Sequence, residues 1–397
     1  MAGVVYDPYS TEIHQDPYPV LSRLRTEAPV YHNPERGFWA VSRYEDVAAV
    51  SLDWERFTTR FGVDIDNYGD VLGGGFFLAQ DPPQHTKLRA VCRTAFGPAR
   101  LREQTEAAIR SEVQALVGRL ARGQATDLAA DLAWELPARA MSVFLGFPRE
   151  DCDRLRQLGI DFLTRNVGDP QPPPASDEAG MALMDYFHNI CWQRASQPTG
   201  DLLSTISTAS IDGQPIGDSA EGLALLLFVG GFENVGCSIT NTLYWLARHP
   251  DQRSWLAANP SQIPAAIEEA LRFDAPQQNF KRTTTRDVEL RGIQIPAGQP
   301  VILLYGAANR DEQRWDQPDI FDIRREPKHH MAFGHGIHHC IGAPLARLEA
   351  QIVLEVVLAE IPHYEFTADP RRLPSHAVRG FAKLPVVASP AAAVTAL

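Results

Sequence analysis

The chain has 397 residues, of which 44% are hydrophobic and 22% are charged, and its formal net charge is -12 at pH 7. This mixture is typical of a globular protein and excludes a disordered chain, and the length allows a core large enough to enclose a ligand cavity. The negative charge disfavours nucleic acid and anionic membrane surfaces as partners.

Targeting signals and cysteine usage both indicate the cytosol. Residues 1–20 are polar and contain three prolines, so we expect neither a signal peptide nor a membrane anchor there. The five cysteines are odd in number, widely separated and include no Cys-x-x-Cys pair: Cys92, Cys152, Cys191, Cys237 and Cys340. We therefore expect a cytoplasmic protein without a disulfide framework or a zinc ribbon.

The first third of the chain mixes short strands with helices. Apolar stretches at residues 30–31 and 38–41 predict strands. Two long segments rich in Gly and Pro predict loops, one at residues 60–80, which includes Gly73-Gly74-Gly75, and one at residues 166–177. Loops of this length in a compact protein are usually functional or mobile, so we expect both to border a binding site.

Helical periodicity dominates residues 101–272. Its longest stretch, residues 219–248, is strongly apolar and is interrupted by Gly230-Gly231. This helix is expected to end before Pro250, because proline disfavours continuation.

The last third begins with a two-residue alternation. Residues 287–305 predict short strands joined by the turn-like Arg291-Gly292, and the apolar spacing after Cys340 predicts an amphipathic helix. We expect a mainly α (α+β) fold in a single domain over residues 1–397. Its β-rich portions lie at roughly 25–60, 280–310 and the C-terminal strands, and its helical portions at roughly 85–275 and 343–361.

One cysteine has unusual surroundings. Residues 333–344 form a glycine-punctuated loop that delivers Cys340 to the beginning of a helix, with Pro344 in its first turn. Backbone N–H groups at that helix end would face the sulfur and favour a thiolate, the form that ligates soft transition metals. The residues alone leave three interpretations open: ligation of haem or another non-zinc metal, a buried free thiol, or a zinc site with His335, His338 and His339.

The same segment resembles the haem-binding loop of the cytochrome P450 family, Phe-Gly-x-Gly-x-His-x-Cys-x-Gly, and matches every fixed position. The resemblance implies the cytochrome P450 fold, with a large helical lobe around haem b and a small β-rich lobe. It also implies that Cys340 is the axial thiolate ligand of the iron and that His338 contacts a haem propionate. Phe333 and Gly342 are the further haem-binding residues that it implies.

Other segments match the family in the expected order, so the resemblance covers nearly the whole chain. Glu269 and Arg272 match the family's Glu-x-x-Arg and share a helix face, where they can pair. Arg324 is the expected third partner. Outside this context such a pair would be read as a solvated surface ion pair of little energetic value.

A second group of matches concerns the haem propionates. Residues 81–89 match Asp-Pro-Pro-x-His-x-x-x-Arg, in which His85 and Arg89 share one helix face and offer hydrogen-bond donors that suit a propionate. Arg282 matches the arginine that completes this cluster. Without the other matches, these residues would be read as a polar helix face and a strand-edge charge.

The long apolar helix carries Gly-Gly-Phe-Glu-Asn-Val at residues 230–235, which resembles the family's Ala/Gly-Gly-x-Asp/Glu-Thr-Thr above the haem. The resemblance implies that Gly231 leaves space for O2, aided by a local loosening of the helix, and that Glu233 supplies the acid. Asn234 departs from the family, which usually has a threonine that assists oxygen activation. Asn234 replaces the hydroxyl through a water, anchors a polar group of the substrate, or reports a weakened oxygen-activation relay.

The resemblance implies a monooxygenase that hydroxylates or epoxidises a small or medium lipophilic substrate, in secondary metabolism or catabolism. We expect a monomer that receives electrons from a separate ferredoxin and its reductase. Asn234 leaves an atypical role open: peroxide-driven, coupling, or sensing without oxygenation. A zinc hydrolase is a remote alternative. The expected pocket lining, whose residues could equally be ordinary core, is Phe76, Phe77, Val229, Phe232, Phe280 and Phe381.

Overall fold

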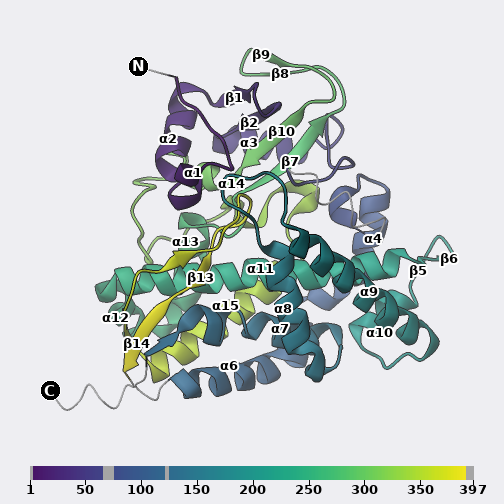
Figure 1. The fold of residues 1–397 in the computed structure, drawn as a ribbon, viewed down its shortest axis with the longest axis vertical. Coiled ribbons are helices and arrows are strands. Elements are labelled where there is room, and N and C mark those ends of the chain that lie inside the picture. Colours follow the sequence, from purple (N-terminus) through teal and green to yellow (C-terminus); the bar gives the residue numbers. More distant parts are fainter. Residues whose placement is uncertain (1–2, 66–75, 121–124, 390–397) are drawn as a thin grey trace.

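The computed structural model describes residues 3–65, 76–120 and 125–389, so much of the expected loop at 60–80, including Gly73-Gly74-Gly75, lies outside the described residues. In Figure 1 the largest sheet lies at the top, above a larger body of helices, and α11 crosses the middle. The expected mainly α (α+β) fold class is confirmed.

The helices that position the site or cover the sheet are α1 (Thr11–Gln15), α2 (Tyr18–Glu27), α3 (Tyr44–Leu52), α4 (Gln84–Arg93), α5 (Pro98–Leu101), α6 (Ala107–Leu120), α7 (Leu136–Leu145), α8 (Cys152–Leu163), α9 (Pro174–Ser196), α10 (Leu202–Ser207), α11 (Ser219–Arg248), α12 (Pro250–Ala258), α13 (Ile263–Phe273), α14 (Tyr305–Ala308) and α15 (Ala343–Glu360). The strands are β1 (Val30–Asn33), β2 (Phe38–Val41), β3 (Phe57–Thr58), β4 (Ala125–Asp127), β5 (Ser210–Ile211), β6 (Gln214–Pro215), β7 (Asn279–Thr284), β8 (Val288–Leu290), β9 (Ile293–Ile295), β10 (Pro300–Leu304), β11 (His363–Phe366), β12 (Arg371–Arg372), β13 (Phe381–Lys383) and β14 (Pro385–Ser389).

The largest sheet has five strands in the order β1-β2-β10-β7-β3, so it joins the beginning of the chain to its last third. β10 pairs parallel with β2 and antiparallel with β7. In β10, Val301 and Leu303 pack with α3, whereas Ile302 and Leu304 pack on the other face with α1 and α2. Both faces are buried, which explains why the strand is a continuous apolar run.

The helix α11 is the central element of the larger region. It runs unbroken for 30 residues through Gly230-Gly231 and ends before Pro250, so the helix predicted over residues 219–248 is confirmed, and the glycines interrupt only its apolar pattern. Within the described part of the chain, it is the one helix long and apolar enough to cross a membrane, and 67% of its most apolar window is buried. Its length and hydrophobicity therefore reflect a position inside the protein.

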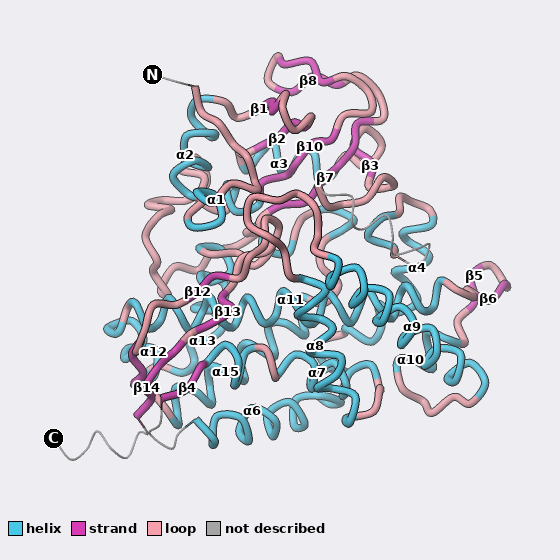
Figure 2. Tube along the Cα trace, in the orientation of Figure 1, coloured by secondary structure: helices cyan, strands magenta, loops and turns pink. Residues whose placement is uncertain are grey.

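Most other boundaries agree with the sequence pattern. The helix predicted after Cys340 is α15, and the strands β8 and β9 flank the expected turn at Arg291-Gly292. Figure 2 shows the C-terminal strands β12 to β14, with β4, lying alongside the helical body. The expected loop at 166–177 is shorter than predicted, because α9 begins at Pro174, and proline is well tolerated in a first helical turn.

Candidate active site

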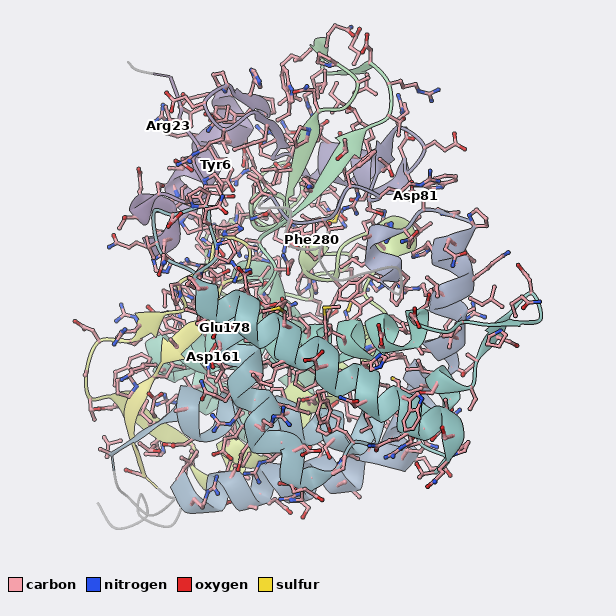
Figure 3. All side chains as sticks on the ribbon, turned by 45° about the vertical axis from the view of Figure 1, so that its right-hand side comes forward. Tyr6, Arg23, Asp81, Asp161, Glu178 and Phe280 are labelled. Atoms are coloured by element: carbon pink, nitrogen blue, oxygen red, sulfur yellow. The ribbon has the colours of Figure 1, made fainter. Side chains whose placement is uncertain are left out.

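A cavity of about 290 Å³ lies where the sheet region meets the helical body. Its walls come from the middle of α11, the beginning of β7, the segment before α15 and residues 375–378. Figure 3 shows Phe280 of β7 between the sheet and α11. Most of the lining is aliphatic or aromatic, which is typical of a site for a small lipophilic molecule.

Cys340 lines this cavity at the end of a tightly folded loop. Its backbone N–H donates to the Phe333 carbonyl at 2.9 Å. Gly336 has a φ of +72°, and a Cβ there would lie 2.6 Å from the Ser51 carbonyl oxygen, so only glycine allows this approach to α3. The loop thereby holds the sulfur directly before α15.

Burial and the neighbouring groups shift the pKa of the Cys340 thiol in opposite directions. Burial raises the pKa of the thiol, while the backbone N–H groups of Gly342 and Ala343 and the Arg89 guanidinium lower it. The expected amide donors are therefore present, although the effect of burial outweighs theirs. Metal coordination would displace the proton, because the thiolate is the ligating form.

Basic side chains gather beside this loop. Arg89 of α4, Arg282 of β7 and His338 line the cavity, whereas His85 lies behind His338, with 4.6 Å between their ring centroids. Burial, together with the neighbouring Arg282, His85 and Arg89, lowers the pKa of His338 to about 2. The Asp81 carboxylate lies near His85, but Arg89 and Arg282 carry two positive charges at the cavity wall, so the cluster is suited to a dianionic ligand.

Several donors in this basic cluster have unused capacity. Neither ring nitrogen of His85 makes a hydrogen bond of good geometry within the described residues, although the Ile337 carbonyl lies nearby. The Nδ1 atom of His338 likewise has no partner there, and its Nε2 lies 3.5 Å from the Thr59 hydroxyl. Buried polar groups are nearly always satisfied, so these atoms indicate a ligand with acceptor oxygens, such as the two propionates of haem.

The histidines around Cys340 do not form a zinc site. Within residues 3–65, 76–120 and 125–389, no three His, Cys, Asp or Glu side chains converge as metal ligands. A single sulfur beside a large apolar cavity is instead the arrangement that an axial ligand of a haem requires.

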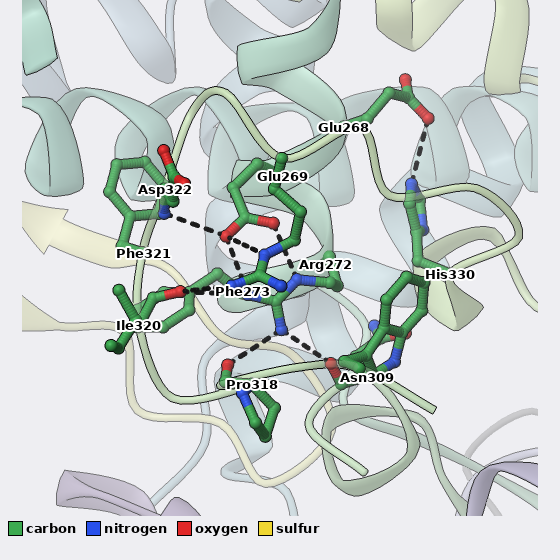
Figure 4. Close-up of polar contacts among 12 residues, drawn as sticks. Glu268, Glu269, Arg272, Phe273, Asn309, Pro318, Ile320, Phe321, Asp322 and His330 are labelled. Atoms are coloured by element: carbon green, nitrogen blue, oxygen red, sulfur yellow. Dashed lines mark hydrogen bonds and ion pairs between the residues drawn. The ribbon is translucent and has the colours of Figure 1, made fainter. Parts of the chain in front are cut away.

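The Glu-x-x-Arg pair is a buried anchor for the segment that leads to the cysteine loop (Figure 4). Arg272 donates twice to the Glu269 carboxylate, at 2.7 and 2.8 Å, and both side chains are fully buried. Arg272 also donates to the carbonyls of Asn309 and Pro318, each at 2.9 Å. The side chain of Asn309 in turn accepts from the Met331 N–H, which links the pair to the loop.

The expected third partner, Arg324, is wrong. The next residue, Arg325, places its Nε 3.2 Å from the Glu269 carboxylate, whereas the Arg324 guanidinium lies over the Trp255 ring at 4.7 Å. A turn closed by the Arg325 N–H on the Asp322 carbonyl directs Arg325 inward. Neighbouring arginines in a turn cannot be distinguished by sequence spacing alone.

On the opposite wall, Gly230 and Gly231 of α11 both line the cavity, but the space expected beside Gly231 lies beside Gly230. A Cβ on Gly231 would lie 2.4 Å from Met141 Sδ, so the space beside Gly231 is occupied mainly by α7. A Cβ on Gly230 would meet nothing within 4 Å, and Gly230 is exposed to the cavity. The open position is therefore Gly230, because the continuous helix rotates Gly231 toward its neighbour.

Glu233 and Asn234 both line the cavity on the same helical turn. Burial raises the pKa of the Glu233 carboxyl to about 8, while Arg165 opposes this shift and Asp64 adds to it. The Oδ1 atom of Asn234 is buried without a hydrogen-bond partner in the described chain. At neutral pH this wall therefore offers a largely protonated acid and an unsatisfied amide.

Four of the six expected pocket residues line the cavity: Phe76, Phe77, Val229 and Phe280. Phe232 and Phe381 do not, and this part of the prediction is wrong. Phe232 lies on the far face of α11, stacked 5.9 Å from Phe228, and Phe381 stacks under the Arg372 guanidinium at 3.8 Å. Residues 166–177, expected to border the site, are likewise not part of the lining, whereas residues 375–378 are.

The sequence interpretation also missed residues that line the cavity. Leu226 and Leu227 lie seven residues before Glu233 and Asn234, respectively, so the helical period of α11 could have identified them. Glu349 of α15 also lines the cavity and is fully buried. Neither oxygen of its carboxyl group has a hydrogen-bond partner among the described residues, and burial raises the pKa of this group well above the usual range. No sequence signal distinguishes Glu349 from an exposed helix acid.

Known proteins share this architecture. A family model described as "Cytochrome P450" matches residues 261–385. The putative cytochrome P450 123 of Mycobacterium tuberculosis is 36% identical over 389 residues, which covers 96% of both chains. This chain belongs to the cytochrome P450 family. The steroid C26-monooxygenase of Rhodococcus jostii is 32% identical over 398 residues, covering 96% of this chain and 83% of that protein. The solved cytochrome P450 CYP109Q5 from Chondromyces apiculatus superposes with a TM-score of 0.88 at 32% identity, covering 98% of this chain and all of that one.

Family membership confirms the expected cofactor and reaction class. The protein is a haem b-dependent P450 monooxygenase, an oxidoreductase that uses O2, and it has the cytochrome P450 fold. Bacterial P450s related to it typically act on lipophilic substrates with O2 and redox partners.

Proposed function

We propose that Cys340 is the axial thiolate ligand of the haem iron and that Arg89, Arg282, His338 and His85 hold the haem propionates. The observation that carries this proposal is the joint placement of the Cys340 sulfur in the cavity wall and of unsatisfied basic groups at its edge. Phe333 and Gly342 complete the pocket wall next to the sulfur. When bound, haem b supplies the oxygen-inserting chemistry.

The chain itself contributes binding, shielding and proton handling. The amides of Gly342 and Ala343 direct their N–H groups at the Cys340 sulfur and moderate its charge. For each O2 consumed, one oxygen atom enters the substrate and the other leaves as water, which requires two electrons and two protons from outside the substrate. Glu233, protonated near neutral pH and facing the cavity, is placed to hold such a proton at its carboxyl.

The substrate we propose is a small or medium lipophilic molecule that is hydroxylated or epoxidised. The largely apolar lining supports this class, as does the relative named as a steroid C26-monooxygenase. We further propose a cytoplasmic monomer that receives electrons from a ferredoxin and its reductase and that acts in secondary metabolism or catabolism.

The deciding experiment is the spectrum of the reduced protein with carbon monoxide. Cys340→Ala should lose the red-shifted band that marks thiolate ligation, whereas Cys92→Ala, which removes a buried thiol of α4, should keep it. A band typical of imidazole ligation in fresh wild-type protein, or equal effects of the two substitutions, would contradict the assignment of Cys340.

A peroxide-driven reaction is a second candidate with one observation in its favour. Arg165 lines the cavity near Glu233, although it follows α8 and is not part of α11. Its Nη1 donates to the carbonyls of Phe162 and Thr164 and to the Ser176 hydroxyl. Product formation with hydrogen peroxide and no electron donor, at a rate above that of the ferredoxin-driven reaction, would favour this candidate.

A further inference from the structure

The cavity wall that α11 forms opposite the Cys340 loop is called the distal wall here. One helical turn of this wall carries polar groups, whereas most of the cavity lining is apolar. Gly230, Glu233 and Asn234 are spaced i, i+3 and i+4, so they share one face of the helix. All three line the cavity, and the missing side chain of Gly230 leaves open space beside the other two. We call these three residues the polar notch.

Within the polar notch, Glu233 has the charged groups of Asp64 and Arg165 nearby, whereas the amide oxygen of Asn234 is unsatisfied. The neighbouring lining residues Leu226, Leu227 and Phe280 are apolar. The Oδ1 atom of Asn234 has no partner in the part of the chain that the structure describes. A buried unsatisfied amide oxygen costs about 1–3 kcal/mol, which a hydrogen-bonding ligand recovers on binding.

The chemistry of the polar notch favours an uncharged ligand group. The amide of Asn234 carries donors and an acceptor but no titratable proton, so it can orient a ligand but cannot exchange a proton with it. Glu233 also offers a donor and an acceptor in its protonated form. A ligand carboxylate would bury a negative charge in a largely apolar lining on the side of the Asp64 carboxylate, and the Nη1 atom of Arg165 already donates to three oxygens.

We infer that the polar notch anchors one uncharged hydrogen-bonding group, a hydroxyl, carbonyl or amide, of an otherwise lipophilic substrate, and that Asn234 is a specificity-determining residue. This inference rests on the proposed function, because the notch acts on a molecule held above the haem. Among the three interpretations of Asn234, it selects substrate anchoring.

The test measures dissociation constants of haem-loaded protein by calorimetry and by the low-to-high-spin shift. The probes are two matched sets, adamantane, 1-adamantanol and adamantane-1-carboxylate, and dodecane, 1-dodecanol and dodecanoate. Asn234→Leu, which keeps the size and removes the amide, should weaken alcohol binding about 10-fold and leave hydrocarbon binding within about twofold. Gly230→Ala, which fills the open space, should also weaken the alcohols selectively, and the carboxylates should bind the wild type more weakly than the alcohols.

The matched control is Asn189→Leu, the same substitution on the exposed face of α9 and outside the cavity lining, which should leave the alcohol affinity unchanged. Parallel losses for alcohol and hydrocarbon, an equal loss in Asn189→Leu, tighter binding of the carboxylates, or no alcohol binding in either set would overturn the inference. The reduced carbon monoxide spectrum separates the two proposals. A thiolate band without alcohol selectivity refutes only the anchoring, whereas a missing band in the wild type refutes the ligation of the haem by Cys340.

Discussion

The two walls of the cavity differ in what determines their geometry. The proximal wall is the irregular loop that ends at Cys340. The close approach at Gly336 and the hydrogen bond from the Cys340 N–H to the Phe333 carbonyl restrict the backbone of this loop to one conformation. The distal wall is one face of a regular helix, where the rotation of α11 decides whether Gly230 or Gly231 faces the cavity. A motif in a constrained loop therefore locates its key residue directly, whereas a motif on a helix leaves adjacent residues to be distinguished by packing.

The largest effect is expected at the buried Glu269–Arg272 pair, which anchors the segment leading to the proximal wall. Glu269→Ala would leave the Arg272 guanidinium buried without its carboxylate, so we expect a loss of about 3–5 kcal/mol in the free energy of unfolding. Chemical denaturation of the holoprotein measures it. Arg324→Ala, which removes a ring contact near the same segment, should cost less than about 1 kcal/mol. Similar losses for both variants would mean that Arg324, not Arg325, supports the pair.

Haem retention tests the basic cluster. Arg282→Leu removes a buried donor at the cavity edge, and a lost hydrogen bond to a charged group is worth about 1.5–3 kcal/mol, so we expect haem dissociation roughly 10- to 100-fold faster. Transfer of haem to an excess of apomyoglobin gives this rate. Arg93→Ala removes the same charge from the exposed end of α4 and is the matched control, which should dissociate at the wild-type rate.

The glycine pair tests the distal wall. Gly231→Ala forces its Cβ against Met141, so we expect a loss of about 1–3 kcal/mol in the free energy of unfolding. Gly230→Ala has open space and gains helix propensity, so the free energy should stay equal or rise by up to about 1 kcal/mol. Denaturation of the two variants side by side measures the contrast, and the opposite order would restore Gly231 as the cavity-facing glycine.

The last test is a pH dependence from Glu233, whose effect within any one pH unit is small. Its pKa rises from the ordinary 4.5 to about 8 in the folded chain because of burial, so between these values the folded state holds a proton that the unfolded state has lost. Stability from this group is fully present below pH 4.5 and decreases as the pH rises to about 8, by at most about 1.4 kcal/mol per pH unit. Denaturation of wild type and Glu233→Gln from pH 5 to 8 should therefore converge at low pH and diverge as the pH rises. Parallel curves would place the Glu233 pKa near its ordinary value.

Much of the fold could be predicted because its patterns are local. The period of α11, the turn at Arg291-Gly292 and the helix after Cys340 each depend on residues a few positions apart. The single-domain organisation over residues 1–397 stays a prediction. The short β4 at Ala125–Asp127, which pairs with β14, could not be anticipated because its partner lies more than 250 residues away.

At the site, residue types were predicted better than directions. The Cys340 loop, Arg89, Arg282 and His338 meet at one cavity, as the motifs imply. The prediction that Phe232 lines the cavity was wrong because a shift of one residue along a helix rotates the side chain by about 100°, here from the cavity to the core. The buried acid Glu349 was missed because its burial depends on tertiary packing that no short pattern encodes.

The helix α11 is locked by complementary contacts on several sides. Gly231 receives Met141, Gly236 receives the Trp134 ring, and the Phe232 ring fits against Gly159 of α8. Each contact pairs an absent side chain with a bulky one, so the helix can neither slide nor roll without a collision. The α11 wall of the cavity is therefore fixed. The cavity must accommodate ligands of different shape through other lining segments, such as residues 76–79 and 375–378.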